Sequence, residues 1–327
     1  MTIPVVICDD SSFARKQIAR ALPSGWDIAI TYAANGREGI EAIKANKGDI
    51  LFLDLTMPEM DGFDVLQFIR ENDLPTLPIV VSGDIQAESR QRVMQLGAVA
   101  FIKKPVNGAE LVSVLNDYGV LDVLTAETVA APEKIEFTDW CQEIANVAMG
   151  RAADLLAQVI DIGVHLSIPK VNLLEQSELA MALESANGKV VSVVSQGFIG
   201  AGVSGETLLL FAEADMAALA RMMKYRGELG DGVERELLMD VANILVGAFL
   251  KGLAEQLDID FSQGHPLMHL HKSRRDILEA GAQEQRTILS IELSYSIGAN
   301  QVHCDQLVLF TEQSLQALKQ RAEVSLV

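Results

Sequence analysis

Short apolar runs alternate with segments of helical spacing along the first third of the chain. The runs are bounded by polar or turn-forming residues, and their length is typical of buried strands. The segments between them place apolar residues three and four positions apart, which predicts helices with one buried face. Strands that alternate with helices form a parallel sheet covered by helices on both faces. The predicted strands cover residues 3–8, 49–54, 77–82 and 98–103, and a last helix begins after Asn107.

Polar side chains lie at the end of each predicted strand. Asp9 and Asp10 follow the first strand, and Asp54, Ser82 and Lys104 mark the ends of the other three. Ligands of parallel sheets bind at the carboxyl ends of the strands, so we expect these side chains to converge. Taken singly, each aspartate is explained as a turn or capping residue and the lysine as a solvated side chain. Together they supply carboxylates for a hard cation such as Mg2+, and a hydroxyl and an ammonium for phosphoryl oxygens.

Two segments make this pattern specific. The motif DLTMPEMDG at 54–62 and the pair Lys104–Pro105, with the acidic pair after the first strand, resemble the receiver domain of two-component response regulators. The resemblance covers about the first 120 residues and implies a flavodoxin-like α/β fold with a parallel five-stranded sheet and helices on both faces. It implies that Asp54 accepts phosphate from a histidine kinase. It also implies that Mg2+ is held by Asp9, Asp10, Asp54 and the Thr56 carbonyl, that Ser82 and Lys104 bind the phosphoryl group, and that Phe101 occupies the aromatic switch position.

The composition narrows the classes of function. A formal charge of −19 argues against binding to nucleic acid, because proteins that bind phosphate backbones present basic surfaces. The cysteines Cys8, Cys141 and Cys304 lack metal-ligand spacing, and we expect reduced core thiols. The sequence has no run of about eighteen apolar residues and no signal-peptide pattern, so we expect a cytoplasmic protein without a membrane partner.

Residues 135–327 contain an internal repeat. A shift of 97 positions aligns polar, glycine and proline residues of the two copies, and the shift becomes 99 further along the chain. Each copy, about 135–230 and about 231–327, predicts a long helix, several strands and a shorter helix. We expect a pseudo-twofold α+β domain with one antiparallel sheet, joined to a first domain at 1–120 by a linker at 121–134. The aligned pairs are Glu143 with Asp240, Asn146 with Asn243, Gly150 with Gly247 and Pro169 with Pro266.

The first long helix carries polar side chains at helical spacing. Asp139, Glu143 and Asn146 fall within about 60° of one another on a helical wheel. An exposed helix face would explain Glu143 alone. It explains less well an asparagine in the middle of the helix in both copies, because asparagine prefers caps and turns. We expect this polar stripe to point outward and the opposite side to pack, through Ile144, Ala148, Leu155 and Val159.

The spacing Asp139-x3-Glu143-x2-Asn146-x22-Pro169 resembles the signature of the CheC/CheX/FliY family of chemotaxis phosphatases, which remove phosphate from receiver domains. The resemblance covers roughly residues 135–327 and implies a phosphoprotein (aspartyl-phosphate) phosphatase, which is a hydrolase. A carboxamide can accept a hydrogen bond from an attacking water and donate another elsewhere. The resemblance implies that Asn146 orients this water and that Glu143 pairs with the receiver's phosphate-binding lysine. It implies a second catalytic pair formed by Asp240 and Asn243.

Two functions of different class follow from these features. The first is an enzyme, a response regulator whose output domain dephosphorylates receiver domains, either its own or that of a separate chemotaxis regulator. The alternative is a phosphorylation-dependent adaptor, in which the CheC-like domain binds a partner without useful turnover. The expected partners are a histidine kinase as phosphate donor and a phosphorylated receiver domain, and formation of a homodimer is left open.

Overall fold

The computed structural model describes residues 2–23, 25–118, 136–175, 191–227, 230–272, 287–298 and 302–326. The chain divides into two compact units, Met1–Glu143 and Ile144–Val327. The predicted linker at 121–134 lies outside the described residues. The proposed domain limits at residues 120 and 135 therefore stay predictions.

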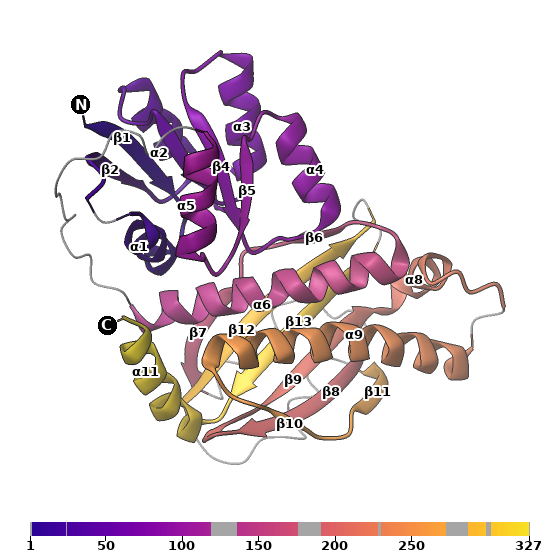
Figure 1. Ribbon diagram of the computed structural model, residues 1–327. Coiled ribbons are helices and arrows are strands. Elements are labelled where there is room, and N and C mark those ends of the chain that lie inside the picture. The colour runs from indigo at the N-terminus through magenta and orange to yellow at the C-terminus, as the bar shows by residue number, and fades with distance from the viewer. Residues whose placement is uncertain are drawn as a thin grey trace. The chain divides into compact units, whose positions relative to one another are not determined.

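Unit 1 is built on a parallel sheet of five strands in the order β2-β1-β3-β4-β5 (Figure 1). This confirms the predicted flavodoxin-like fold. The second strand in the chain is not among the runs predicted from the sequence. It forms an edge of the sheet, and four of its six residues are half-buried or exposed, so its apolar pattern is weak. The strands are β1 (Ile3–Cys8), β2 (Ile28–Ala33), β3 (Ile50–Leu53), β4 (Leu77–Ser82) and β5 (Ala100–Lys103).

Helices cover both faces of this sheet. One apolar core includes Ile18 and Leu111 from the first and last of these helices, and the core on the opposite face includes Ile40 and Leu66. Asn107 Oδ1 accepts a hydrogen bond from the Ala109 N–H at 2.9 Å, which confirms its predicted role as cap of the last helix. The helices are α1 (Ser12–Ala21), α2 (Gly36–Lys44), α3 (Gly62–Glu71), α4 (Ala87–Gln95) and α5 (Gly108–Asp117).

Unit 2 is built on an antiparallel sheet of eight strands. Its path runs β10-β8-β9-β13-β12-β6, with β11 added beside β8 and β7 beside β12. Two long hairpins, β8–β9 and β12–β13, supply the centre of the sheet. The strands are β6 (Val164–Leu166), β7 (Lys170–Glu175), β8 (Val191–Gly200), β9 (Val203–Ala212), β10 (Ser262–Gln263), β11 (Leu267–Lys272), β12 (Thr287–Ile297) and β13 (Val302–Phe310).

The two sequence copies meet at the centre of this sheet. In the pairing of β9 with β13, Leu208 stands opposite Leu307, and these residues are equivalent because 307 − 208 = 99. When a residue pairs with its own equivalent, a twofold axis passes between the two residues, so the register supports the predicted pseudo-twofold arrangement. Another equivalent pair, Thr207 and Gln306, forms a buried hydrogen bond of 3.1 Å across the same strands.

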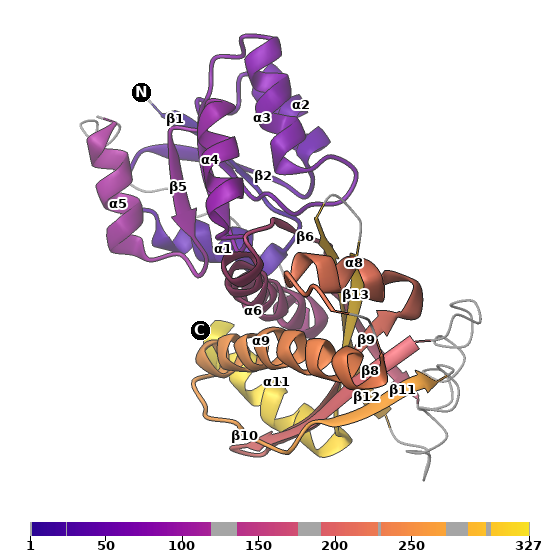
Figure 2. The ribbon, with the colours of Figure 1, turned by 90° about the vertical axis from the view of Figure 1, so that its right-hand side faces the viewer.

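The long and short helices of unit 2 follow the predicted order in both copies. The long helices are α6 (Phe137–Ile160), whose first two turns belong to unit 1, and α9 (Asp231–Leu257). A short helix follows the last strand of each copy, α8 (Met216–Met222) after the 3-10 turn η2 (Glu213–Asp215), and α11 (Glu312–Leu326). Helix α9 packs on β8 and β9, and α11 packs on β9 and β12 (Figure 2).

Among the described residues, one helical stretch is long and apolar enough to cross a membrane by length and composition. It is Gly232–Leu257 of α9, with a mean hydropathy of 1.7, and 61% of its most apolar window is buried inside the fold. The core helix of a globular domain passes the same test. The packing of α9 on the sheet of unit 2 is the packing of a core helix.

Candidate functional site

Three carboxylates converge at the carboxyl ends of β1 and β3. Cys8 of β1 pairs with Leu53 of β3, and this register carries the residues that follow both strands to one edge of the sheet. As a result, ligand oxygens of Asp9, Asp10 and Asp54 lie within 4.8 Å of one another. Asp9 and Asp54 are fully buried. The sequence prediction that the strand ends would converge is confirmed for this acidic trio.

A buried ammonium group faces the trio. Lys104 follows β5, and its backbone N–H donates to the Ser82 carbonyl at 3.0 Å. Its Nζ lies 2.7 Å from Asp9 Oδ2 and 3.3 Å from Asp54 Oδ1, with 2% of the side chain exposed. Burial alone would lower the pKa of Lys104, but the surrounding carboxylates of Asp54, Asp9 and Glu143 raise it well above its ordinary value. The surrounding carboxylates therefore favour the charged form of Lys104.

The pKa values of two carboxyl groups of the trio are raised, and oxygens of the trio remain available to a cation. Burial, followed by the charges of Asp9 and Asp54, raises the pKa of Asp10 to about 7. The pKa of Asp9 rises to about 6, mainly through burial, although Lys104 opposes the shift. Asp9 Oδ2 and Asp54 Oδ1 form ion pairs with Lys104, and neither oxygen has a further hydrogen-bond partner among the described residues. These oxygens keep lone pairs for a ligand, and oxygen donors of this kind suit Mg2+. The residues present therefore fit the expected ion.

The remaining predicted receiver residues lie at the ends of neighbouring strands. Thr56, in the loop after β3, donates its N–H to Asp54 Oδ2 at 3.0 Å. Ser82 ends β4, is buried, and accepts a hydrogen bond from the Asp84 N–H at 3.2 Å. Phe101 lies half-buried on β5, with the Arg90 guanidinium 6.0 Å from its ring centroid. Their roles toward phosphate and metal stay predictions.

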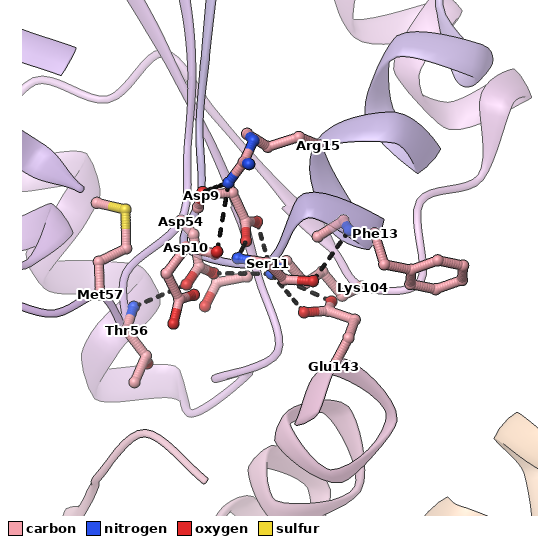
Figure 3. A network of polar contacts seen from close by, with 12 residues as sticks. Asp9, Asp10, Ser11, Phe13, Arg15, Asp54, Thr56, Met57, Lys104 and Glu143 are labelled. Atoms are coloured by element: carbon pink, nitrogen blue, oxygen red, sulfur yellow. Dashed lines mark hydrogen bonds and ion pairs between the residues drawn. The ribbon is translucent and has the colours of Figure 1, made fainter. Parts of the chain in front are cut away.

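One residue that no sequence pattern indicated fixes the acidic pair. Arg15 of α1 is buried, and its Nη1 donates to the carbonyl oxygens of Asp9 at 2.7 Å and Asp10 at 3.3 Å (Figure 3). The Ser11 N–H adds a hydrogen bond of 3.0 Å to Asp9 Oδ1. In the sequence, Arg15 lies in a polar part of an amphipathic helix. No spacing rule indicates that it turns back toward the strand end.

The first turns of α6 bring three further side chains to this site within unit 1. Glu143 Oε1 lies 3.2 Å from Lys104 Nζ, and burial raises the pKa of Glu143 to about 8 (Figure 3). Gln142 Nε2 donates to Asp10 Oδ2 at 3.1 Å. The carboxylate of Asp139 accepts hydrogen bonds from the backbone N–H groups of Ser12 and Phe13 at the start of α1, at 3.2 Å and 3.0 Å.

The predicted orientation of this helix is confirmed only in part, because Ile144 and Ala148 are buried as expected but most of the polar stripe is buried as well. Glu143 is 4% exposed and Asn146 is 6% exposed, whereas Leu155 and Val159, expected to pack, are 43% and 52% exposed. Helical-wheel analysis assigns polar residues to solvent. It fails for Glu143 because the carboxylate is compensated by Lys104, a partner distant in sequence. In the second copy, on α9, Asp240 and Asn243 are exposed.

Comparison with known proteins identifies the first part of the chain. Residues 5–116 match the family described as response regulator receiver domain. A protein-glutamate methylesterase/protein-glutamine glutaminase of Geobacter sulfurreducens is 38% identical over 157 residues, which cover 46% of this chain and 40% of that protein. The chain thus spans about two fifths of the length of this relative.

Two solved structures resemble parts of the chain. One is FliY of Thermotoga maritima, with 17% identity, coverage of 61% of this chain and 100% of that one, and a TM-score of 0.45. The other comes from the CheX-CheY-BeF3-Mg complex of Borrelia burgdorferi, with 31% identity, coverage of 36% and 88%, and a TM-score of 0.32. At these TM-scores neither likeness identifies the second unit.

The curated relatives correct one expectation. The sequence analysis predicted an aspartyl-phosphate phosphatase. Several curated relatives, from Geobacter, Geobacillus and other organisms, are instead named protein-glutamate methylesterase/protein-glutamine glutaminase, which is a different hydrolase activity. The predicted phosphatase activity is therefore contradicted.

Proposed function

We propose that this chain is a response regulator in which the receiver domain, residues 5–116, is phosphorylated on Asp54 with Mg2+ bound. Phosphorylation then switches a second domain that acts by binding a partner. One observation carries the proposal. Three carboxylates with oxygens within 4.8 Å of one another surround a buried lysine, whose Nζ is 3.3 Å from Asp54.

The geometry suits transfer of a phosphoryl group to Asp54. The Thr56 N–H holds Asp54 Oδ2, while Oδ1 remains beside Lys104. A carboxylate oxygen of Asp54 forms the new bond to phosphorus as the nitrogen–phosphorus bond of a kinase phosphohistidine breaks, and the electron pair stays on the imidazole. Lys104 and Ser82 then donate to the phosphoryl oxygens. Asp9, Asp10, Asp54 and the Thr56 carbonyl would hold Mg2+, which would supply positive charge to neutralise these oxygens.

The second domain, residues 135–327, is proposed to be CheC-like and to work as an adaptor without useful turnover. The repeated Asn-x22-Pro spacing and the pairing of Leu208 with Leu307 support the CheC-like assignment. Asp240 and Asn243 are exposed on α9 and offer a carboxylate and an amide to a docking protein. A phosphorylated receiver domain of a chemotaxis regulator suits this face, because the Asn243 amide can donate to a phosphoryl oxygen and Asp240 can pair with a basic side chain beside that site.

Burial of the first amide favours binding over turnover. Asn146 is 6% exposed, and a group that orients water on an incoming substrate has to be reachable. In the second copy, aspartate replaces glutamate beside Asn243, which moves the carboxylate back by on the order of 1 Å. A displacement of this size costs about 10²-fold in rate.

The lifetime of the phosphorylated protein tests the adaptor. The full chain is phosphorylated with acetyl phosphate and Mg2+, the donor is removed, and loss of the phosphoryl group is followed by mass spectrometry. The Asn146→Ala/Asn243→Ala double variant is treated in the same way, and Asp54→Asn serves as the unphosphorylated control. An adaptor predicts equal lifetimes for the parent and the double variant. A clearly shorter lifetime in the parent would reject the adaptor.

A further inference from the structure

We infer that the first two turns of α6 are an internal competitor for the phosphorylation site, which a bound phosphoryl group and cation displace. This inference rests on the proposed function and adds a mode of regulation to it. In the resting protein, Gln142 and Glu143 occupy binding groups that the activated site needs, and Asp139 anchors the same helix turns to the start of α1. We call these three residues the plug.

Glu143 occupies N–H donors of Lys104. An ammonium group has three N–H donors. Around Lys104 Nζ lie four carboxylate oxygens: Asp9 Oδ2 at 2.7 Å, Asp54 Oδ1 at 3.3 Å, and Glu143 Oε1 and Oε2 at 3.2 and 3.4 Å. No donor is left over for a phosphoryl oxygen on Asp54. Lys104 can bind that oxygen only by giving up an existing partner, and Glu143 is the partner that does not belong to the acidic trio.

Gln142 takes an oxygen from the expected metal site. Its Nε2 donates to Asp10 Oδ2 at 3.1 Å. A cation that binds Asp10 through the same oxygen has to displace this hydrogen bond, because an amide N–H and a metal ion cannot share one lone pair. The plug therefore opposes both ligands of the activated site, the cation through Gln142 and the phosphoryl group through Glu143.

Asp139 anchors the plug away from the ligands. Its carboxylate accepts the backbone N–H groups of Ser12 and Phe13, which open α1. An acidic group at a helix N-terminus is favourable, and two charge-assisted hydrogen bonds add to the attraction. Residues 142 and 143 lie three and four positions after residue 139, so both are neighbours of Asp139 on the helix surface. A rigid helix makes and breaks these contacts together, so displacement at Glu143 is transmitted to Asp139.

Charge gives the displacement its direction. Phosphorylation adds negative charge beside Glu143, which disfavours the ionised form of this carboxyl group and so weakens its pairing with Lys104. The phosphoryl group also gains Lys104 as a donor. Both effects favour the released plug once Asp54 is modified. Without the phosphoryl group, Lys104 favours the docked plug.

Binding of two probes to the full chain tests the inference: Mg2+ alone, and beryllofluoride at saturating Mg2+ as the phosphoryl mimic. Glu143→Gln and Gln142→Ala weaken the plug. Glu110→Gln, an exposed carboxylate on α5, and Gln67→Ala, which loses a hydrogen bond to Glu71, are the matched controls. Removing one charge-assisted contact is expected to tighten beryllofluoride binding by about tenfold in Glu143→Gln, and Mg2+ binding severalfold in Gln142→Ala, with no change in the controls.

The neutral variant separates competition from simple electrostatics. If Glu143 acted only as a nearby charge, Gln142→Ala would bind Mg2+ with the affinity of the parent. In the same case, Glu143→Gln would bind Mg2+ more weakly than the parent. Either result would overturn the inference. Hydrogen exchange gives a second readout. The amides of Ser12 and Phe13 are expected to lose protection when beryllofluoride saturates the site, and unchanged protection would show that the plug stays docked. Failure of the proposed function looks different, because Asp54→Asn would then bind beryllofluoride as well as the parent does.

Discussion

Replacement of Lys104 by methionine removes a buried positive charge that faces Asp9, Asp54 and Glu143. Methionine keeps most of the side-chain volume, so the change isolates the charge. Breaking a buried ion pair by removing one partner costs about 3–5 kcal/mol, because the other charge stays buried without compensation. With an m-value of about 2 kcal/mol per M of urea, the unfolding midpoint falls by about 1.5–2.5 M.

The assay uses the native tryptophans. The chain contains two, Trp26 and Trp140; Trp26 is 2% exposed in an apolar core of unit 1. In a Trp140→Phe background, Trp26 fluorescence reports urea unfolding of unit 1. The matched control is Lys103→Met, because Lys103 is the exposed neighbour and surface substitutions stay within about 0.5 kcal/mol.

Added Mg2+ should recover part of the loss in Lys104→Met, since a cation can replace the missing charge among the carboxylates. The loss should also be smaller at pH 6 than at pH 8, because protonated carboxyls need no partner. A midpoint for Lys104→Met equal to that for Lys103→Met at pH 8 would refute the reasoning. It would show that the carboxylates do not depend on Lys104.

Three further predictions concern pH, backbone packing and unit 2. Burial raises the pKa of Asp10 to about 7, so the native state keeps a proton that the unfolded state releases near pH 4. The free energy of unfolding without Mg2+ should therefore fall as the pH rises from about 4 to about 7. A urea midpoint that rises over this range would contradict this prediction. Gly62→Ala places a Cβ in a steric clash with the Asp54 carbonyl oxygen and should lower both the stability of the protein and the phosphorylation of Asp54. Gly232→Ala adds a Cβ with nothing within 4 Å and should stabilise α9 by about 0.5–1 kcal/mol. Equal effects of the two substitutions in urea unfolding would disprove the contrast. Tyr295→Phe removes the hydroxyl that donates a buried hydrogen bond of 3.0 Å to Gln306 Oε1 and should lower the free energy of unfolding by about 1–3 kcal/mol. Urea unfolding followed by circular dichroism measures this loss, and an unchanged midpoint would mean that Gln306 finds another donor.

Much of unit 1 could be predicted because its signals are local. Each buried strand is a short apolar run, and the acidic trio and Lys104 stand where those runs end. The parallel pairing of β1 with β3 then brings Asp9 and Asp54 together. The cysteines are free and buried among the described residues, as the sequence indicated. In unit 2, the shift of 99 makes Leu208 and Leu307 equivalent in sequence, and the structure shows that these equivalent residues pair.

The failures concern side chains whose partners are distant in sequence. The face of α6 was expected to be solvated, because a helical wheel cannot show that Lys104 lies against Glu143. Arg15 was missed for a similar reason, since its partners are backbone carbonyl groups. The expected enzymatic activity rested on spacing alone, and spacing does not show whether an amide such as Asn146 is accessible.

The central claim, that Asp54 accepts a phosphoryl group in a Mg2+-dependent site, is tested most directly by intact-mass measurement after incubation with acetyl phosphate. The account predicts a gain of one phosphoryl group in the parent with Mg2+. It predicts no gain with a chelator present and none in Asp54→Asn. Equal incorporation in the parent and Asp54→Asn, or incorporation unaffected by the chelator, would contradict it.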